Sequence, residues 1–279
     1  MAPRDQAIPE ALYRNAINLN RYSNGVARRV IDAYNDIILD ASFQLAAIDE
    51  VTSPGTTLRL RTLLAQLQDS LGTWAINSTT VTQEQLQGLA VLQSEFIQDQ
   101  LRKVLPSDAA KAAVRTVEIS PQFAQSVVTT DPTRVNVFTL PEELTAQVTG
   151  VSPTFSLTAR EGAVITLPNG ATVQKAFRGL ATQQADLFTR TVRNGLLTGE
   201  TTQNIARRLK GRLQFNQEGN VRQVIAAGGQ LTKLANNQVL TIVRTSINQV
   251  SNAATQKVYQ ANSDITDQYR YVATLDSRT

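Results

Sequence analysis

Apolar residues recur every three or four positions through the first third of the chain, a spacing typical of helices with one buried face. One long helix is predicted over residues 9–49, with the stripe Leu12, Ala16, Leu19, Val26, Val30, Ala33, Ile37 and Ala41. The run Ser53-Pro54-Gly55 then breaks the pattern. A second helix over residues 56–71, which makes a helical hairpin with the first, carries the leucines Leu58, Leu60, Leu63, Leu64 and Leu67.

A third helix is predicted from Thr82 to near Pro106. Its stripe consists of Leu86, Leu89, Leu92, Phe96, Ile97 and Leu101. Helical spacing then ends, and residues 114–173 are rich in β-branched side chains and contain five prolines. The clearest element there is a β-hairpin of residues 163–167 and 171–174, because Asn169-Gly170 supplies the positive φ angles of a tight turn.

Helical spacing returns over residues 180–196, and Gly199 stands where a C-terminal capping glycine is expected. Thr201 or Thr202 can cap a short helix in which Ile205 and Leu209 share a face, and residues 213–220 form a polar linker. A last long helix is predicted over residues 237–262, before a strand-like run at 269–275. Its buried stripe is Val239, Val243, Ile247, Val250, Ala254 and Val258.

These elements predict a mainly α fold of the α+β class with three regions. Residues 1–110 form an N-terminal helical region, residues 111–176 a small irregular β region, and residues 177–279 a C-terminal helical domain that ends in a strand. Long helices in so short a chain rarely bury both faces internally. We therefore expect the N-terminal helices to dock on another protein.

The chain contains neither Cys nor His, which removes thiolate nucleophiles, the usual general base and the commonest metal ligand. A Ser-His-Asp triad, a Cys-His pair and a zinc finger are therefore impossible with these residues. We expect no catalytic activity and no cofactor. The sequence also has no apolar run long enough to cross a membrane and no apolar signal core near Met1, which predicts synthesis in the cytoplasm.

The net charge of +4 is concentrated in one segment, since residues 190–222 alone carry +5. Its basic residues are Arg190, Arg193, Arg207, Arg208, Lys210, Arg212 and Arg222. This cluster has two interpretations. Contact with the phosphates of packaged DNA would bind without sequence preference. A solvated face, or ion pairs with an acidic partner, is favoured slightly because the segment is poor in aromatic residues that stack on bases.

Three stretches of the last hundred residues resemble one known family. They are the segment 195–209, GLLTGETTQNIARRL, the segment 243–254, VRTSINQVSNAA, and the terminal YVATLDSRT at 271–279. In this order they are similar to the head-morphogenesis, or minor head, proteins of tailed bacteriophages, the Mu protein F-like family. Family members commonly continue after the last motif into a Cys/His-containing segment. We therefore expect the natural polypeptide to extend past Thr279.

The resemblance implies a structural protein of the phage head, made in the host cytoplasm and located in the virion near the portal or the inner capsid surface. The implied partners are the portal protein, the major capsid protein, or both, with packaged double-stranded DNA as a non-specific alternative and no membrane. The motif residues implied are Gly199, Arg244, Thr245, Asp276 and Arg278, with Arg244 anchoring the Asp276 loop. Two alternatives stay open: an internal or ejected DNA-binding protein, and the binding part of a longer polypeptide with a C-terminal enzyme domain.

Overall fold

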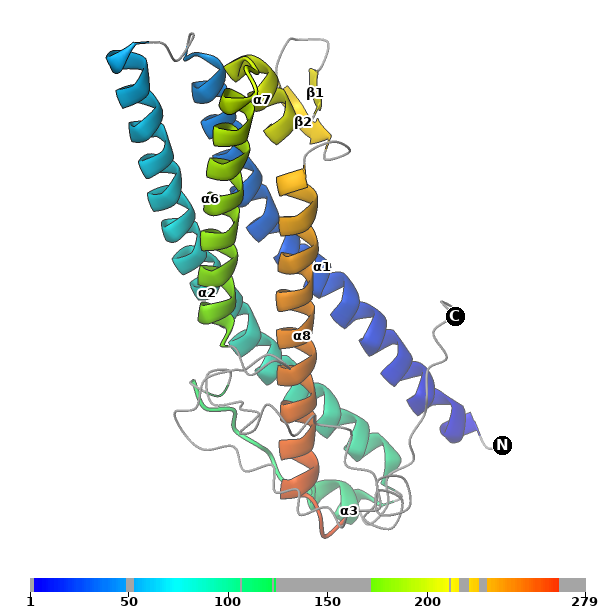
Figure 1. Cartoon of the computed structure of the whole chain (residues 1–279). Coiled ribbons are helices and arrows are strands. Elements are labelled where there is room, and N and C mark those ends of the chain that lie inside the picture. The colour runs from blue at the N-terminus through cyan, green and yellow to red at the C-terminus, as the bar shows by residue number, and fades with distance from the viewer. Residues whose placement is uncertain are drawn as a thin grey trace, which may run out of the picture. The chain divides into compact units, whose positions relative to one another are not determined.

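The computed structural model describes residues 3–48, 53–105, 107–121, 123, 172–210, 212–215, 221–225 and 230–265 (Figure 1). This part of the chain is mostly helical, which confirms the mainly α class. No described helix is long and apolar enough to span a membrane. The elements are α1 (Pro3–Ala46), α2 (Pro54–Val104), α3 (Asp108–Ala112), α6 (Val173–Leu197), α7 (Thr202–Lys210), β1 (Arg212–Phe215), β2 (Val221–Ile225) and α8 (Gln230–Ala261).

Helix α2 corrects the prediction of two separate helices with a break between residues 71 and 82. It runs without interruption for 51 residues, through a Ser/Thr-rich stretch that has low intrinsic helix propensity. Trp74 and Ala75 are buried within this stretch, and the hydroxyl of Thr79 bonds to the Ala75 carbonyl at 2.8 Å. Packing of the buried face of α2 therefore outweighs the low helix propensity of this stretch.

The predicted break before α2 is confirmed, and it is a helix N-cap. The Ser53 hydroxyl accepts the Thr56 amide at 3.2 Å, while the Thr56 hydroxyl accepts the Ser53 amide at 3.2 Å. Pro54 occupies the first helical position, where a missing N–H costs nothing. Three local residues thus define where α2 begins.

The buried stripe of α1 agrees with the predicted one at Val26, Val30 and Ala41 but differs from it between Val30 and Ala41. Ala33 is exposed and Ile37 is only half-buried, whereas Tyr34 and Ile38 are fully buried. The prediction used only aliphatic residues and therefore left out Tyr34. A tyrosine is amphipathic, and its hydroxyl needs a hydrogen-bond partner when it is buried. On α8 the prediction is confirmed: all six stripe residues are buried, although the helix begins at Gln230, seven residues earlier than expected.

The segments after residue 163 differ from prediction in two places. Val173 and Gln174, predicted to end a β-hairpin, instead begin α6; the turn and first strand of that hairpin lie outside the described residues. The prediction of a polar linker at 213–220 is wrong for its first three residues, because they belong to β1. This strand pairs antiparallel with β2, with Arg212 opposite Ile225. Valines and an isoleucine at 221–225 have the strand preference that favours this pairing. The expected strand at 269–275 lies outside the described residues.

The chain forms two compact units, each assembled from separated segments. Unit 1 contains Met1–Tyr22, Gln83–Val173 and Thr245–Thr279, and unit 2 contains Ser23–Thr82 and Gln174–Arg244. The three sequence regions predicted above, with boundaries at 110 and 176, stay a prediction.

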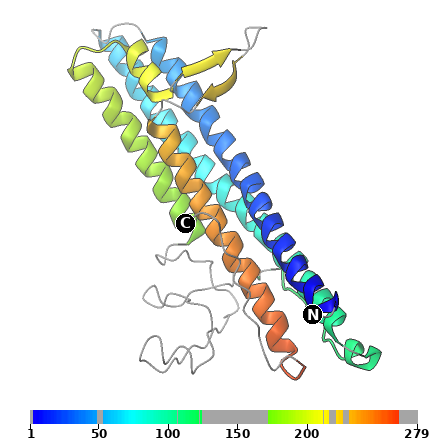
Figure 2. The ribbon, with the colours of Figure 1, turned by 90° about the vertical axis from the view of Figure 1, so that its right-hand side faces the viewer.

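The core of unit 2 is an aromatic cluster contributed by three helices. In both views the unit 2 segments of α1, α2, α6 and α8 run side by side (Figure 2). The Trp74 ring lies 5.4 Å from Tyr34 and 5.8 Å from Phe177 between centroids, the latter edge to face. The Trp74 indole donates to the Val30 carbonyl at 3.0 Å, and the Tyr34 hydroxyl donates to Gln184 at 2.9 Å. Burial raises the pKa of Tyr34 far above its usual value.

Unit 1 links its long helices with polar side chains. The Gln93 amide of α2 accepts from Asn15 of α1 and donates to Thr255 of α8, both at 3.0 Å. Tyr22 of α1 donates to Gln85 of α2 at 3.0 Å. Leu92, predicted to belong to the apolar stripe, is 62% exposed, whereas the neighbouring Gln93 is buried. These bonds fix the register of the helices more specifically than apolar packing alone.

Candidate functional site

Residues 195–209 span the end of α6, a turn and most of α7. Gly199 has a φ of +74°, the left-handed conformation that glycine adopts without strain. Its amide donates to the Leu196 carbonyl at 3.1 Å, and the Glu200 amide donates to the Gly195 carbonyl at 2.8 Å. These two bonds make a Schellman motif. The predicted role of Gly199 as a C-cap is therefore confirmed.

Gly195 allows α7 to approach α6 closely. A Cβ atom built on Gly195 would lie 2.5 Å from Cγ1 and 2.6 Å from Cδ1 of Ile205, and 2.9 Å from Oε2 of Glu200. Ile205 is fully buried, so its side chain has little room to give way. The sequence analysis placed Gly195 within a motif, but it did not explain why a glycine is needed there. The reason is the close contact with Ile205.

Helix α7 is anchored by a cap and by one apolar face. Thr201 caps it, since its hydroxyl accepts the Asn204 amide at 3.3 Å. Thr202, the other candidate cap, instead donates to the Ile48 carbonyl beyond the end of α1 at 2.7 Å. Ile205 and Leu209 are both buried, as predicted.

The basic cluster divides into residues that hold the unit together and residues that face solvent. Arg208 lies 3.1 Å from the Glu200 carboxylate and donates to the Thr191 carbonyl at 3.2 Å, so it joins α7 to α6. Arg190 lies 3.9 Å from Asp186, one helical turn away, and both side chains are exposed. An exposed pair of this kind contributes little to stability. Arg208 therefore has a structural role, which its position in a run of basic residues did not indicate.

Lys210 lies over the face of Phe43, with Nζ 4.3 Å from the ring centroid. Partial burial lowers the pKa of Lys210, and the neighbouring Arg207 lowers it further. Arg193 and Arg207 are exposed and have no carboxylate partner among the described residues. The side chains of Arg212 and Arg222, on β1 and β2, lie outside the described part. Two solvated cations thus remain for a partner.

The predicted contact between Arg244 and the Asp276 loop falls partly outside the described residues, because Asp276 and Arg278 are not among them. Arg244 itself is exposed and donates to the Asn24 side chain of α1 at 2.8 Å. Thr245 is half-buried. The described structure therefore shows Arg244 joining α8 to α1, and the anchoring of Asp276 stays a prediction.

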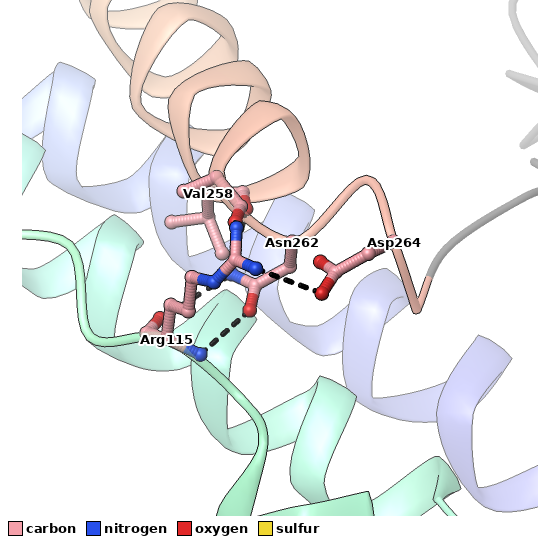
Figure 3. Close-up of polar contacts among 5 residues, drawn as sticks. Arg115, Val258, Asn262 and Asp264 are labelled. Carbon is pink, nitrogen blue, oxygen red and sulfur yellow. Dashed lines mark hydrogen bonds and ion pairs between the residues drawn. The ribbon is translucent and has the colours of Figure 1, made fainter.

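Sequence reasoning missed a second polar site, in unit 1, where Arg115 meets the end of α8 (Figure 3). The fully buried Asn262 side chain accepts the Arg115 amide at 2.7 Å and donates to the Arg115 carbonyl at 3.3 Å. The Arg115 guanidinium donates to the Ala261 carbonyl at 3.0 Å and pairs with Asp264 at 2.8 Å. The only signal in the sequence was an asparagine at the predicted helix end.

No group of three or more His, Cys, Asp or Glu side chains that could hold a metal occurs among the described residues. What α6 and α7 present chemically is exposed guanidinium groups, those of Arg193 and Arg207 among them, on a tightly packed frame. In comparisons with known proteins, no protein-family model, no curated protein and no solved structure matches this chain.

Proposed function

We propose that this protein is a non-enzymatic structural component of a tailed-bacteriophage head. In this role it binds the portal or the inner capsid surface and assists head assembly, DNA packaging or ejection. The observation that carries the proposal is the likeness of residues 195–209 and 243–254 to the head-morphogenesis family. Support comes from Gly195 and Gly199 within the first segment, since close packing favours glycine at Gly195 and a positive φ favours it at Gly199.

The absence of His and Cys from the sequence supports a binding role over a catalytic one, because it removes the commonest acid–base and nucleophilic groups. Exposed apolar side chains give further support. Leu58 on α2 is 65% exposed and Leu197 at the end of α6 is 76% exposed. Arginine is enriched at protein–protein interfaces, and the fully buried core of such interfaces is apolar.

The test is co-expression of the tagged chain with the portal and major capsid proteins encoded by the same genome, followed by affinity purification. We expect the portal protein, the capsid protein or both to co-purify. Mass spectrometry of purified virions should then find the chain at a few copies per particle. The proposal would be abandoned if neither protein co-purified and purified virions contained none of the chain.

A second candidate, contact with packaged DNA, is favoured by one observation: Arg193 and Arg207 are exposed and not neutralised by any described carboxylate. Binding through phosphates would release counterions and weaken steeply as salt increases. Retention of a labelled DNA duplex, measured over a salt series, separates the two candidates. Retention that is absent at low salt, or that does not change with salt, rules out phosphate contact.

A further inference from the structure

Residues 114–121, the strap, follow α3 in unit 1 without forming a helix or a strand ladder. Polar side chains of α2 and α8 bond to the main chain of this strap. Gln87 of α2 donates to the Ser120 carbonyl at 2.6 Å, and Lys257 of α8 donates to the Glu118 carbonyl at 3.2 Å. These contacts stand in for the backbone partners that a sheet would supply.

The same pattern continues along the strap. Ser94 of α2 donates to the Val117 carbonyl at 3.4 Å, and Asn262, just past the end of α8, bonds to both the amide and the carbonyl of Arg115 (Figure 3). We call Gln87, Ser94, Lys257 and Asn262 the strap receptor. Because these bonds reach main-chain atoms, they do not depend on which side chains the strap carries.

Apolar anchors at the two ends fix the register of the strap. Val114 is 6% exposed and Phe123, just past the strap, is 4% exposed. The Lys257 ammonium lies 5.2 Å from the Phe123 ring centroid, so one lysine contacts both the ring and the Glu118 carbonyl. Most strap side chains between the anchors are exposed or half-buried. The strap is therefore held through its backbone, its two anchors and the Arg115 side chain, which pairs with Asp264.

The chain that leads into the strap is held only by its own local bonds. Between α2 and Val114, the described side chains at 105–113 are exposed or half-buried, none of them buried. Helix α3 has five residues, too few to be stable alone, and is supported by a Ser107 cap and a Lys111–Asp108 pair. Extended, these nine residues would span about 30 Å. The strap can therefore be redirected without the loss of a buried contact in residues 105–113.

We propose that the strap is exchangeable between copies of this chain: the strap receptor of one copy accepts the strap of a second copy, which joins the two. Every receptor bond and both anchors are the same whichever copy supplies the segment, so the exchange costs little and is driven by concentration. The occupant is a second copy because the anchor spacing matches the chain's own residues 114 and 123. This inference does not depend on the proposed function.

The absence of cysteine from this sequence permits a direct test. One copy carries Gln87→Cys and a second, of different size, carries Ser120→Cys; Ser120 is exposed and Gln87 half-buried. The mixture is taken briefly through a urea concentration that loosens the fold and returned to buffer, so that exchange is not limited by slow release. A short bismaleimide then links thiols that lie close together, without the strict geometry of a disulfide.

We expect a cross-linked product of the mixed size whose yield rises with protein concentration. The matched control replaces Gln87→Cys with Leu92→Cys, an exposed position further along α2 that does not bond to the strap. Random collision would trap the Leu92→Cys pair at least as often, because that position is more exposed than Gln87, whereas exchange traps only the first pair. A single chain with both Gln87→Cys and Ser120→Cys checks that the pair can be linked. Efficient links within that chain, but none between copies at any concentration, would overturn the proposal.

Discussion

Replacing Gly195 with alanine tests the packing of α7 against α6. The new Cβ would lie 2.5 and 2.6 Å from two carbons of Ile205, which is fully buried. Overpacking of this kind costs about 1–3 kcal/mol. Alanine also returns about 0.5–1 kcal/mol because it is a better helix former than glycine. The net change in the free energy of unfolding is expected to be a loss of up to about 2 kcal/mol.

A matched control removes the helix-propensity contribution. Gly179 lies in the same helix, is exposed and has no atom within 4 Å of a built Cβ. Gly179→Ala should therefore stabilise the protein by about 0.5–1 kcal/mol. The difference between the two alanine variants isolates the clash with Ile205, about 1–3 kcal/mol. In an Ile205→Ala background, which removes both clashing carbons, Gly195→Ala should behave like the control.

The assay is urea unfolding followed by tryptophan fluorescence. Trp74 is the only tryptophan, is buried, and packs against Phe177 of α6, so its emission reports on unit 2. Unfolding midpoints with an unchanged slope give the differences in stability. If Gly195→Ala and Gly179→Ala agreed within about 0.5 kcal/mol, the close contact between α6 and α7 would be refuted.

Three further outcomes follow from described contacts. Gly199→Ala should lose about 1–2 kcal/mol because of the positive φ, and Gly199→Asn should lose less; equal unfolding midpoints for the wild type and the alanine variant would contradict this. Below pH 10.0, the usual pKa of tyrosine, Tyr34 is neutral in both the folded and the unfolded protein. Above that pH only the unfolded protein loses the proton, because burial raises the pKa of Tyr34 in the folded one. Stability should therefore fall by about 1.4 kcal/mol per pH unit above 10, and Tyr34→Phe should reduce that slope in melts between pH 9 and 11. Arg208→Gln should destabilise unit 2 by about 1 kcal/mol, whereas Arg193→Gln with Arg207→Gln should leave stability within about 0.5 kcal/mol of the wild type. If DNA contact occurs, that double variant should reduce the salt dependence of duplex retention, and an unchanged salt slope would exclude these two arginines.

The sequence by itself determined the features whose causes are local. The stripe of α8 was read correctly because every third or fourth residue of one helix lies on the same face. The break at Ser53-Pro54-Gly55 and the C-cap at Gly199 were predicted because the residues that begin or end a helix lie within one turn of its end. The absence of His and Cys excluded whole classes of chemistry without any fold.

Only the tertiary structure decided features that depend on a partner distant in the chain. Burial of Trp74 keeps α2 continuous through residues of poor propensity, and the bond from Tyr34 to Gln184, 150 positions away, moves the stripe of α1 off Ala33. Nothing local distinguishes the paired Arg208 from the solvated Arg207. The bond between Asn262 and Arg115 spans 147 positions. Side-chain periodicity reports which face of an element is apolar, but it contains no information about which distant groups will satisfy a buried polar atom.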